Sequence, residues 1–184
     1  MNLNLIFSKT YQWEYEKGIT DHKLDKGGKT NDGITLGHYN AFCLEVLGRK
    51  PSDEHFINMT KAEILKFYAR VWQRMGCDKI ENPLLAGICF DFGFNSAFAK
   101  REIQEVLQGL GYKIQADNVF GPATIGALNQ AHRQYKYGLL DLIFVARLTY
   151  VGSLVYRQTD QIAFLKGWLN RIFDWRELVK ANYE

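Results

Sequence analysis

Residues 13–35 read WEYEKGITDHKLDKGGKTNDGIT and join an amphipathic segment to a polar, glycine-rich loop. The residues before the loop, LNLIFSKTYQWEYEK, place apolar side chains on one helical face, and Gly18 is typical of a helix end. This pattern predicts that Glu16 lies in the last helical turn. Asp32-Gly33 is typical of a tight turn between two short strands, so the loop is expected to close as a hairpin.

Three side chains of this stretch are suited to hydrolysis of a glycosidic bond. At a helix end, unpaired carbonyl groups and the helix dipole disfavour ionisation, so partial burial there would raise the pKa of Glu16. A carboxyl group that stays protonated near neutral pH can protonate a leaving oxygen. In a wetter loop, Asp25 is expected to stay ionised and to orient a water or stabilise a cationic transition state, while Thr30 holds that water.

The stretch resembles the catalytic segment of the bacterial and phage muramidases of glycoside hydrolase family 108. That segment reads Glu-Gly-Gly, a polar stretch, Asp-Pro-Gly-Gly-x-Thr and Gly-Ile-Ser; here the corresponding phrases are EKG at 16–18, DKGGKT at 25–30 and GIT at 33–35. The resemblance implies that Glu16 is the catalytic acid and that Asp25 and Thr30 assist it. It also implies cleavage of the β-1,4 bond between N-acetylmuramic acid and N-acetylglucosamine. Lys17 and Lys26 depart from the family pattern.

The resemblance continues through the chain in three further phrases. Phe90-Asp91 with Asn95-Ser96 is similar to a Phe-Asp…Asn-Ser stretch of the family, and Gly167-Trp168-x-Asn170-Arg171 is similar to its closing signature. The phrase from Asp117 to Thr124, Asp-x-x-x-Gly-Pro-x-Thr, resembles a small helical peptidoglycan-binding segment. The alternative for that phrase is a structural turn followed by a good helix start.

Helical signals dominate the rest of the chain. Thr35 is expected to cap a helix over 36–48. Thr60 and Glu63 form a capping box that begins a further helix. Asn82-Pro83 begins an apolar helix, LLAGICFDFGFN, that should be central and buried. Further helices are predicted over 97–110, after Gly121-Pro122, over 138–158 and in the C-terminal tail. Only residues 19–35 look strand-like. The pattern predicts a mostly helical, lysozyme-like α+β fold over 1–184, with a catalytic half (1–90) and a helical peptidoglycan-binding half (91–184).

Six polar or aromatic side chains are candidates for contact with the sugar. Asp91 and Asn95 share a helical face and would either line the cleft or satisfy buried groups. Gln104 lies beside an apolar stripe, where it would contact the cleft or lie on the surface. Trp13 is an aromatic residue suited to stacking on a sugar ring or to a core position, as are Tyr39 and Trp168. Arg147 interrupts an apolar helix, so a carboxylate partner in the helical core is expected.

Composition limits the other function classes. The net charge of +3 is modest and evenly spread, so nucleic acid is not an expected partner. Cys43, Cys77 and Cys89 lie in apolar contexts and are expected to be buried thiols; no metal ligands or cofactor are predicted. We find no secretory signal and no apolar run of about 18 residues. We therefore expect a monomer made in the cytoplasm, without membrane insertion, that acts at the cell wall after release or signal-independent export.

Two functions remain open on the sequence. The first is a peptidoglycan hydrolase that uses general acid catalysis. The second is a non-catalytic peptidoglycan-binding or secretion-associated protein on the same fold, in which Lys17 and Lys26 mark a lost active site.

Overall fold

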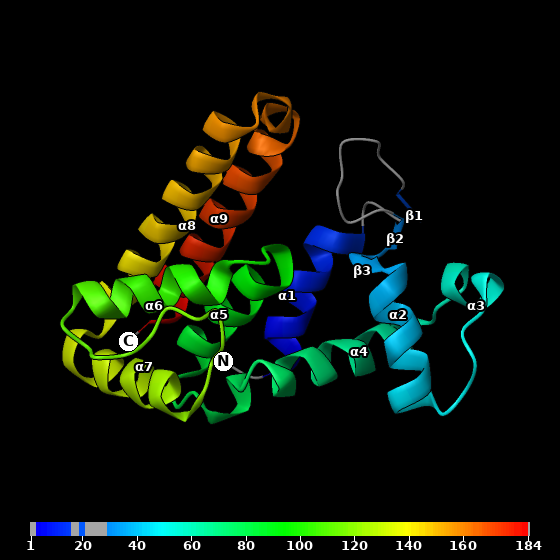
Figure 1. The fold of residues 1–184 in the computed structure, drawn as a ribbon, viewed down its shortest axis with the longest axis horizontal. Coiled ribbons are helices and arrows are strands. Elements are labelled where there is room, and N and C mark those ends of the chain that lie inside the picture. The colour runs from blue at the N-terminus through cyan, green and yellow to red at the C-terminus, as the bar shows by residue number, and fades with distance from the viewer. Residues whose placement is uncertain (1–2, 16–18, 21–28, 184) are drawn as a thin grey trace. The chain divides into compact units, whose positions relative to one another are not determined.

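The computed structural model describes residues 3–15, 19–20 and 29–183 of the chain. These residues form two compact units, one within Asn4–Arg70 and the other from Val71 onwards together with Leu3. The described elements are mostly helices, with one small antiparallel sheet (Figure 1). The prediction of a mostly helical α+β fold is therefore confirmed.

The smaller unit holds the first helices and the sheet. Its elements are α1 (Leu3–Tyr15), β1 (Ile19–Thr20), β2 (Thr30–Asn31), β3 (Ile34–Thr35), α2 (Leu36–Phe42), a π-helical turn (Cys43–Leu47), α3 (Asp53–Ile57) and the larger part of α4 (Lys61–Arg74). Its core is a cluster of large apolar side chains: Ile6, Phe7, Ile34, Tyr39, Phe42, Phe56, Ile64, Phe67 and Tyr68.

The sheet has three short strands in the order β1-β2-β3. Asp32 and Gly33 turn the chain from β2 into β3 with φ angles of 47° and 76°, the left-handed backbone that the Asp-Gly pair predicts. Thr35 then caps α2, because its side-chain oxygen accepts a hydrogen bond from the backbone N–H of His38. The capping box of Thr60 and Glu63 is present at the start of α4.

The larger unit is built of helices. After a short 3-10 turn (Cys77–Lys79) come α5 (Pro83–Asn95), α6 (Ala99–Gly109), α7 (Pro122–Tyr135) and α8 (Tyr137–Arg157); a second 3-10 turn (Thr159–Gln161) leads into α9 (Ile162–Asn182). Figure 1 shows α8 and α9 side by side, and these helices are in contact. The predicted starts of α5 and α7 at proline are confirmed.

Helix α5 is the centre of the larger unit. Every residue from Leu84 to Phe92 is buried, as the apolar composition of this segment predicts. A Cβ at Gly93 would lie 2.1 Å from Cε of Met75, so a side chain there would require the end of the Met75 side chain to move. Cys43, Cys77 and Cys89 are buried and not in disulfides, and burial raises the pKa of the Cys77 and Cys89 thiols.

Helix α8 combines an apolar composition with a buried charge. Its length and its mean hydropathy of 1.6 would suffice to cross a membrane, although such composition is also common in core helices. One third of the apolar stretch is buried within the protein, and the buried part includes the charged side chain of Arg147.

Candidate functional site

Of the three residues predicted to be catalytic, only Thr30 lies in the described part of the chain. Thr30 is in β2, where it pairs with Thr20 of β1 and Thr35 of β3, and its side chain is partly exposed. Glu16 and Asp25 lie outside the described residues. Their roles therefore stay predictions from the sequence.

A second acidic residue of the same region has a defined position. Glu14, in the last turn of α1, is 95% buried, and its carboxyl group lies directly over Gly33: a Cβ there would be 2.4 Å from Oε2 of Glu14. The neighbouring side chain of Asp32 is also buried. Burial, together with the negative charge of Glu14, raises the pKa of Asp32. The pattern predicts Asp32 only as a turn residue, and nothing local in the sequence indicates this pairing of carboxyl groups.

Strand β2 is anchored to α3 by Asn31, the residue after Thr30. The buried amide of Asn31 donates hydrogen bonds to the backbone carbonyl oxygens of Phe56, at 2.6 Å, and Ile57, at 3.3 Å. Helix α3 thereby fixes the strand on which Thr30 lies.

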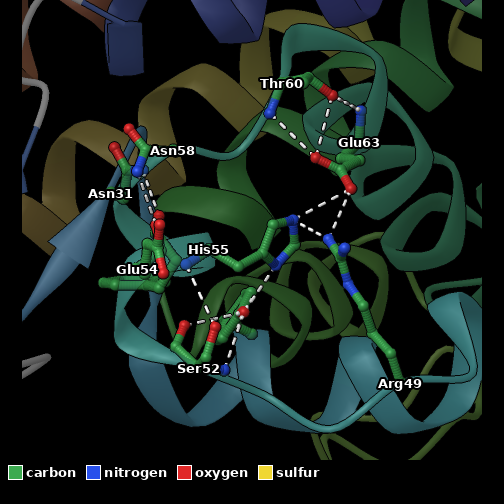
Figure 2. Close-up of polar contacts among 10 residues, drawn as sticks. Asn31, Arg49, Ser52, Glu54, His55, Asn58, Thr60 and Glu63 are labelled. Carbon is green, nitrogen blue, oxygen red and sulfur yellow. Dashed lines mark hydrogen bonds and ion pairs between the residues drawn. The ribbon is translucent and has the colours of Figure 1, made fainter.

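A polar network in turn anchors α3 to the two neighbouring helices (Figure 2). The Nδ1 atom of His55 lies 2.7 Å from the hydroxyl of the buried Tyr39, and Nε2 lies 3.0 Å from Oε1 of Glu63. Arg49 contacts the His55 ring and donates a hydrogen bond to the same carboxylate at 2.7 Å. Burial alone would raise the pKa of Glu63, but hydrogen bonds from Thr60 and Arg49 and the charge of His55 lower it overall. The network is structural support for the sheet region.

Asp91 lies in the core of the larger unit. Its side chain is fully buried and accepts hydrogen bonds from Arg147 at 2.8 Å and from Arg171 at 2.7–3.2 Å. Burial opposes ionisation, but the two guanidinium groups outweigh it and lower the pKa of Asp91 to about 2. The expected carboxylate partner of Arg147 is therefore confirmed. Asp91 exposes no surface to a sugar; the structure favours the alternative in which it satisfies buried groups.

Gln104 is also fully buried, whereas both sequence interpretations placed it at a surface. Its amide nitrogen donates to Asp117, to the carbonyl of Val119 and to Thr124, and its oxygen accepts from the backbone N–H of Asn118 at 2.8 Å. Gln104 thus holds the loop that leads into α7. Because the loop and the first turn of α7 supply these partners 13 to 20 residues further along the chain, the helical pattern around Gln104 does not reveal them.

The remaining two candidates are partly exposed. Trp13 lies near the end of α1 in the smaller unit, and Asn95 is the last residue of α5 in the larger unit. Asn95 contributes to a pocket of about 100 Å³ that Arg147, Tyr150 and Trp168 also line. A wider pocket of about 500 Å³ lies near the ends of α7 and α9. Within the described part of the chain, no cluster of three or more His, Cys, Asp or Glu side chains is placed to hold a metal ion.

Two known protein families match successive parts of the chain. Residues 8–97 match the family described as Glycosyl hydrolase 108, and residues 98–173 match the family described as Predicted Peptidoglycan domain. The chain is similar to the solved structure of Brucella abortus SagA, with 26% sequence identity and a TM-score of 0.69. That similarity covers 97% of this chain and 95% of SagA. No curated protein matches.

Proposed function

We propose that this chain, which belongs to glycosyl hydrolase family 108 and continues into a predicted peptidoglycan domain, is a muramidase. It would cleave the β-1,4 bond between N-acetylmuramic acid and N-acetylglucosamine in peptidoglycan. The observation that carries the proposal is the pairing of the two matched families in one chain, the first over 8–97 and the second over 98–173. The first supplies the class of reaction and the second the polymer.

The proposed roles follow the motif residues. Glu16 protonates the oxygen of the leaving sugar, and Asp25 stays ionised to orient water or to stabilise the positive charge that develops on the ring. Thr30 holds the water through its hydroxyl group. The anchoring of β2 through Asn31 supports this role, because a hydrogen-bonded strand keeps the hydroxyl in one place. Glu14 has no catalytic role in the proposal, since its carboxyl group is buried over Gly33.

The test is the release of reducing ends from purified peptidoglycan. We expect wild type to release them and Glu16→Gln to lower the rate at least about 100-fold, the usual contribution of a general acid. Glu14→Gln is the matched control, because it makes the same exchange of a carboxyl group for an amide two residues earlier in the sequence; it should keep most of the activity. Equal rates for wild type and Glu16→Gln would refute the assignment of the acid.

The second candidate function is peptidoglycan binding without catalysis. It is favoured by the family match over 98–173 and by Lys17 and Lys26, which stand where the resembling family has Gly and Pro. A pulldown on the same peptidoglycan separates the two functions. Retention of both proteins on the polymer, with no reducing ends from either, would support the binding function, and Lys17→Gly would then test whether activity returns.

A further inference from the structure

The pocket beside Asn95 has walls of two chemical kinds. It lies within the larger unit, at the end of α5 and against α8 and α9, and its volume is about 100 Å³. Phe92, Val151 and Leu154 form an apolar wall, and the rings of Tyr150 and Trp168 complete the lining. These walls come from both matched regions, since α5 ends at Asn95 and α8 and α9 follow residue 98.

The polar side of the pocket consists of an amide, a hydroxyl and a guanidinium group. The Oγ atom of Ser96 is buried and has no hydrogen-bond partner within the described part of the chain. Oδ1 of Asn95 lies 3.5 Å from Nη2 of Arg147, a distance at the limit for a hydrogen bond. Asp91 holds Arg147 by Nη1, and the guanidinium group stacks 5.2 Å from the Phe92 ring. The guanidinium group of Arg147 is therefore held in place by the core.

We propose that this pocket binds the acetamido group of an N-acetylated amino sugar. The inference rests on the proposed function, because peptidoglycan carries that group on both of its sugars. The methyl group would contact Val151 and Leu154, while Ser96, Asn95 and Arg147 would hydrogen-bond the amide. A ring of the sugar would lie against Trp168, which is partly exposed.

The size of the pocket and its apolar wall favour an acetamido group. A volume of about 100 Å³ suits a group of a few heavy atoms, rather than a whole sugar ring. A carboxylate of the same size would also accept from Arg147, but Nη1 of Arg147 already donates to Asp91, and an anion would lie against the apolar wall, where its burial is costly. A neutral amide with a methyl group matches both sides of the pocket.

The test measures binding in the Glu16→Gln background, so that no substrate is consumed. The probes are tetramers of β-1,4-linked N-acetylglucosamine and of glucosamine, titrated by calorimetry. We expect the acetylated tetramer to bind at least about tenfold more tightly. Leu154→Trp, which fills the pocket, should abolish that preference. Leu142→Trp is the matched control, because Leu142 is exposed on the same helix and does not line the pocket; it should keep the preference.

Two further measurements complete the test. Ser96→Ala should weaken binding of the acetylated tetramer about fivefold, as expected for loss of one neutral hydrogen bond, and circular dichroism should confirm that each variant is folded. Acetamide should displace the acetylated tetramer, whereas acetate, of the same size but charged, should not. Equal binding of the two tetramers, an unchanged preference in Leu154→Trp, or displacement by acetate alone would overturn the inference.

The outcome is separate from that of the hydrolysis assay. Binding with acetyl preference but without release of reducing ends would leave the pocket assignment standing and refute the muramidase proposal. Release of reducing ends by wild type, together with an unchanged acetyl preference in Leu154→Trp, would support the muramidase proposal and refute the pocket assignment.

Discussion

The most informative substitution for the fold is Asp91→Asn, which removes the negative charge between two buried arginines. The side chains of Arg147 and Arg171 are each 3% exposed, and that of Asp91 is not exposed at all. Loss of one partner from such a buried cluster leaves an uncompensated charge, which typically costs about 3–5 kcal/mol. For a protein of this size that loss corresponds to a fall of about 10 °C in melting temperature.

Urea unfolding followed by tryptophan fluorescence is the suitable assay. Three of the four tryptophans, Trp72, Trp168 and Trp175, lie in the larger unit with Asp91, so the signal reports mainly on that unit. The control is Glu81→Gln. Glu81 pairs with Arg133, but both side chains are about 60% exposed, so the loss should stay below about 1 kcal/mol.

The pH dependence gives a second measure of the same interaction. The pKa of Asp91 falls from its ordinary value of 3.8 to about 2 on folding, so the ionised carboxylate stabilises the fold fully above pH 3.8. This contribution, about 2 kcal/mol, is lost as the pH falls from 3.8 through 2. The stability gap between wild type and Asp91→Asn should therefore narrow by about 1 kcal/mol between pH 7 and pH 3. A destabilisation below about 1 kcal/mol at pH 7, with weaker binding to peptidoglycan, would refute the structural role of Asp91.

Two other predictions concern the sheet region and the loop before α7. Gly33→Ala should lower the free energy of unfolding by at least about 1 kcal/mol more than the control Gly48→Ala. Both glycines have positive φ, but of the two only Gly33 lies where a Cβ would meet another side chain, that of Glu14. Urea melts of the two variants measure the difference, and equal losses would contradict the close contact. Gln104→Leu should cost about 1 kcal/mol or more, because the buried hydroxyl of Thr124 and the backbone N–H of Asn118 each lose a hydrogen-bond partner. It should also raise the pKa of Asp117, which the Gln104 amide lowers. An NMR titration that shows an unchanged Asp117 pKa would argue against that contact.

Most of the long helices, the hairpin turn and the likeness to a family could be predicted from the sequence alone, whereas α3 and the π-helical turn at Cys43–Leu47 were not predicted. The turn at Asp32-Gly33, the cap at Thr35 and the helix start at Pro83 each depend on a few neighbouring residues, because turn and capping geometry is local. The burial of α5 followed from its composition alone, since a helix that is apolar all round must be surrounded by protein.

Tertiary structure alone decided the partners of the buried polar side chains. Arg171 binds Asp91 across 80 residues of sequence, and Gln104 takes its partners from the loop after α6 and from the first turn of α7. The spacing of apolar residues along a helix does not specify which distant elements it will contact. The sequence alone therefore cannot distinguish a polar helical residue that contacts a ligand from one that supports the structure. Asp91 and Gln104 are support because burial leaves them no surface, whereas Asn95 reaches a pocket because it ends its helix there.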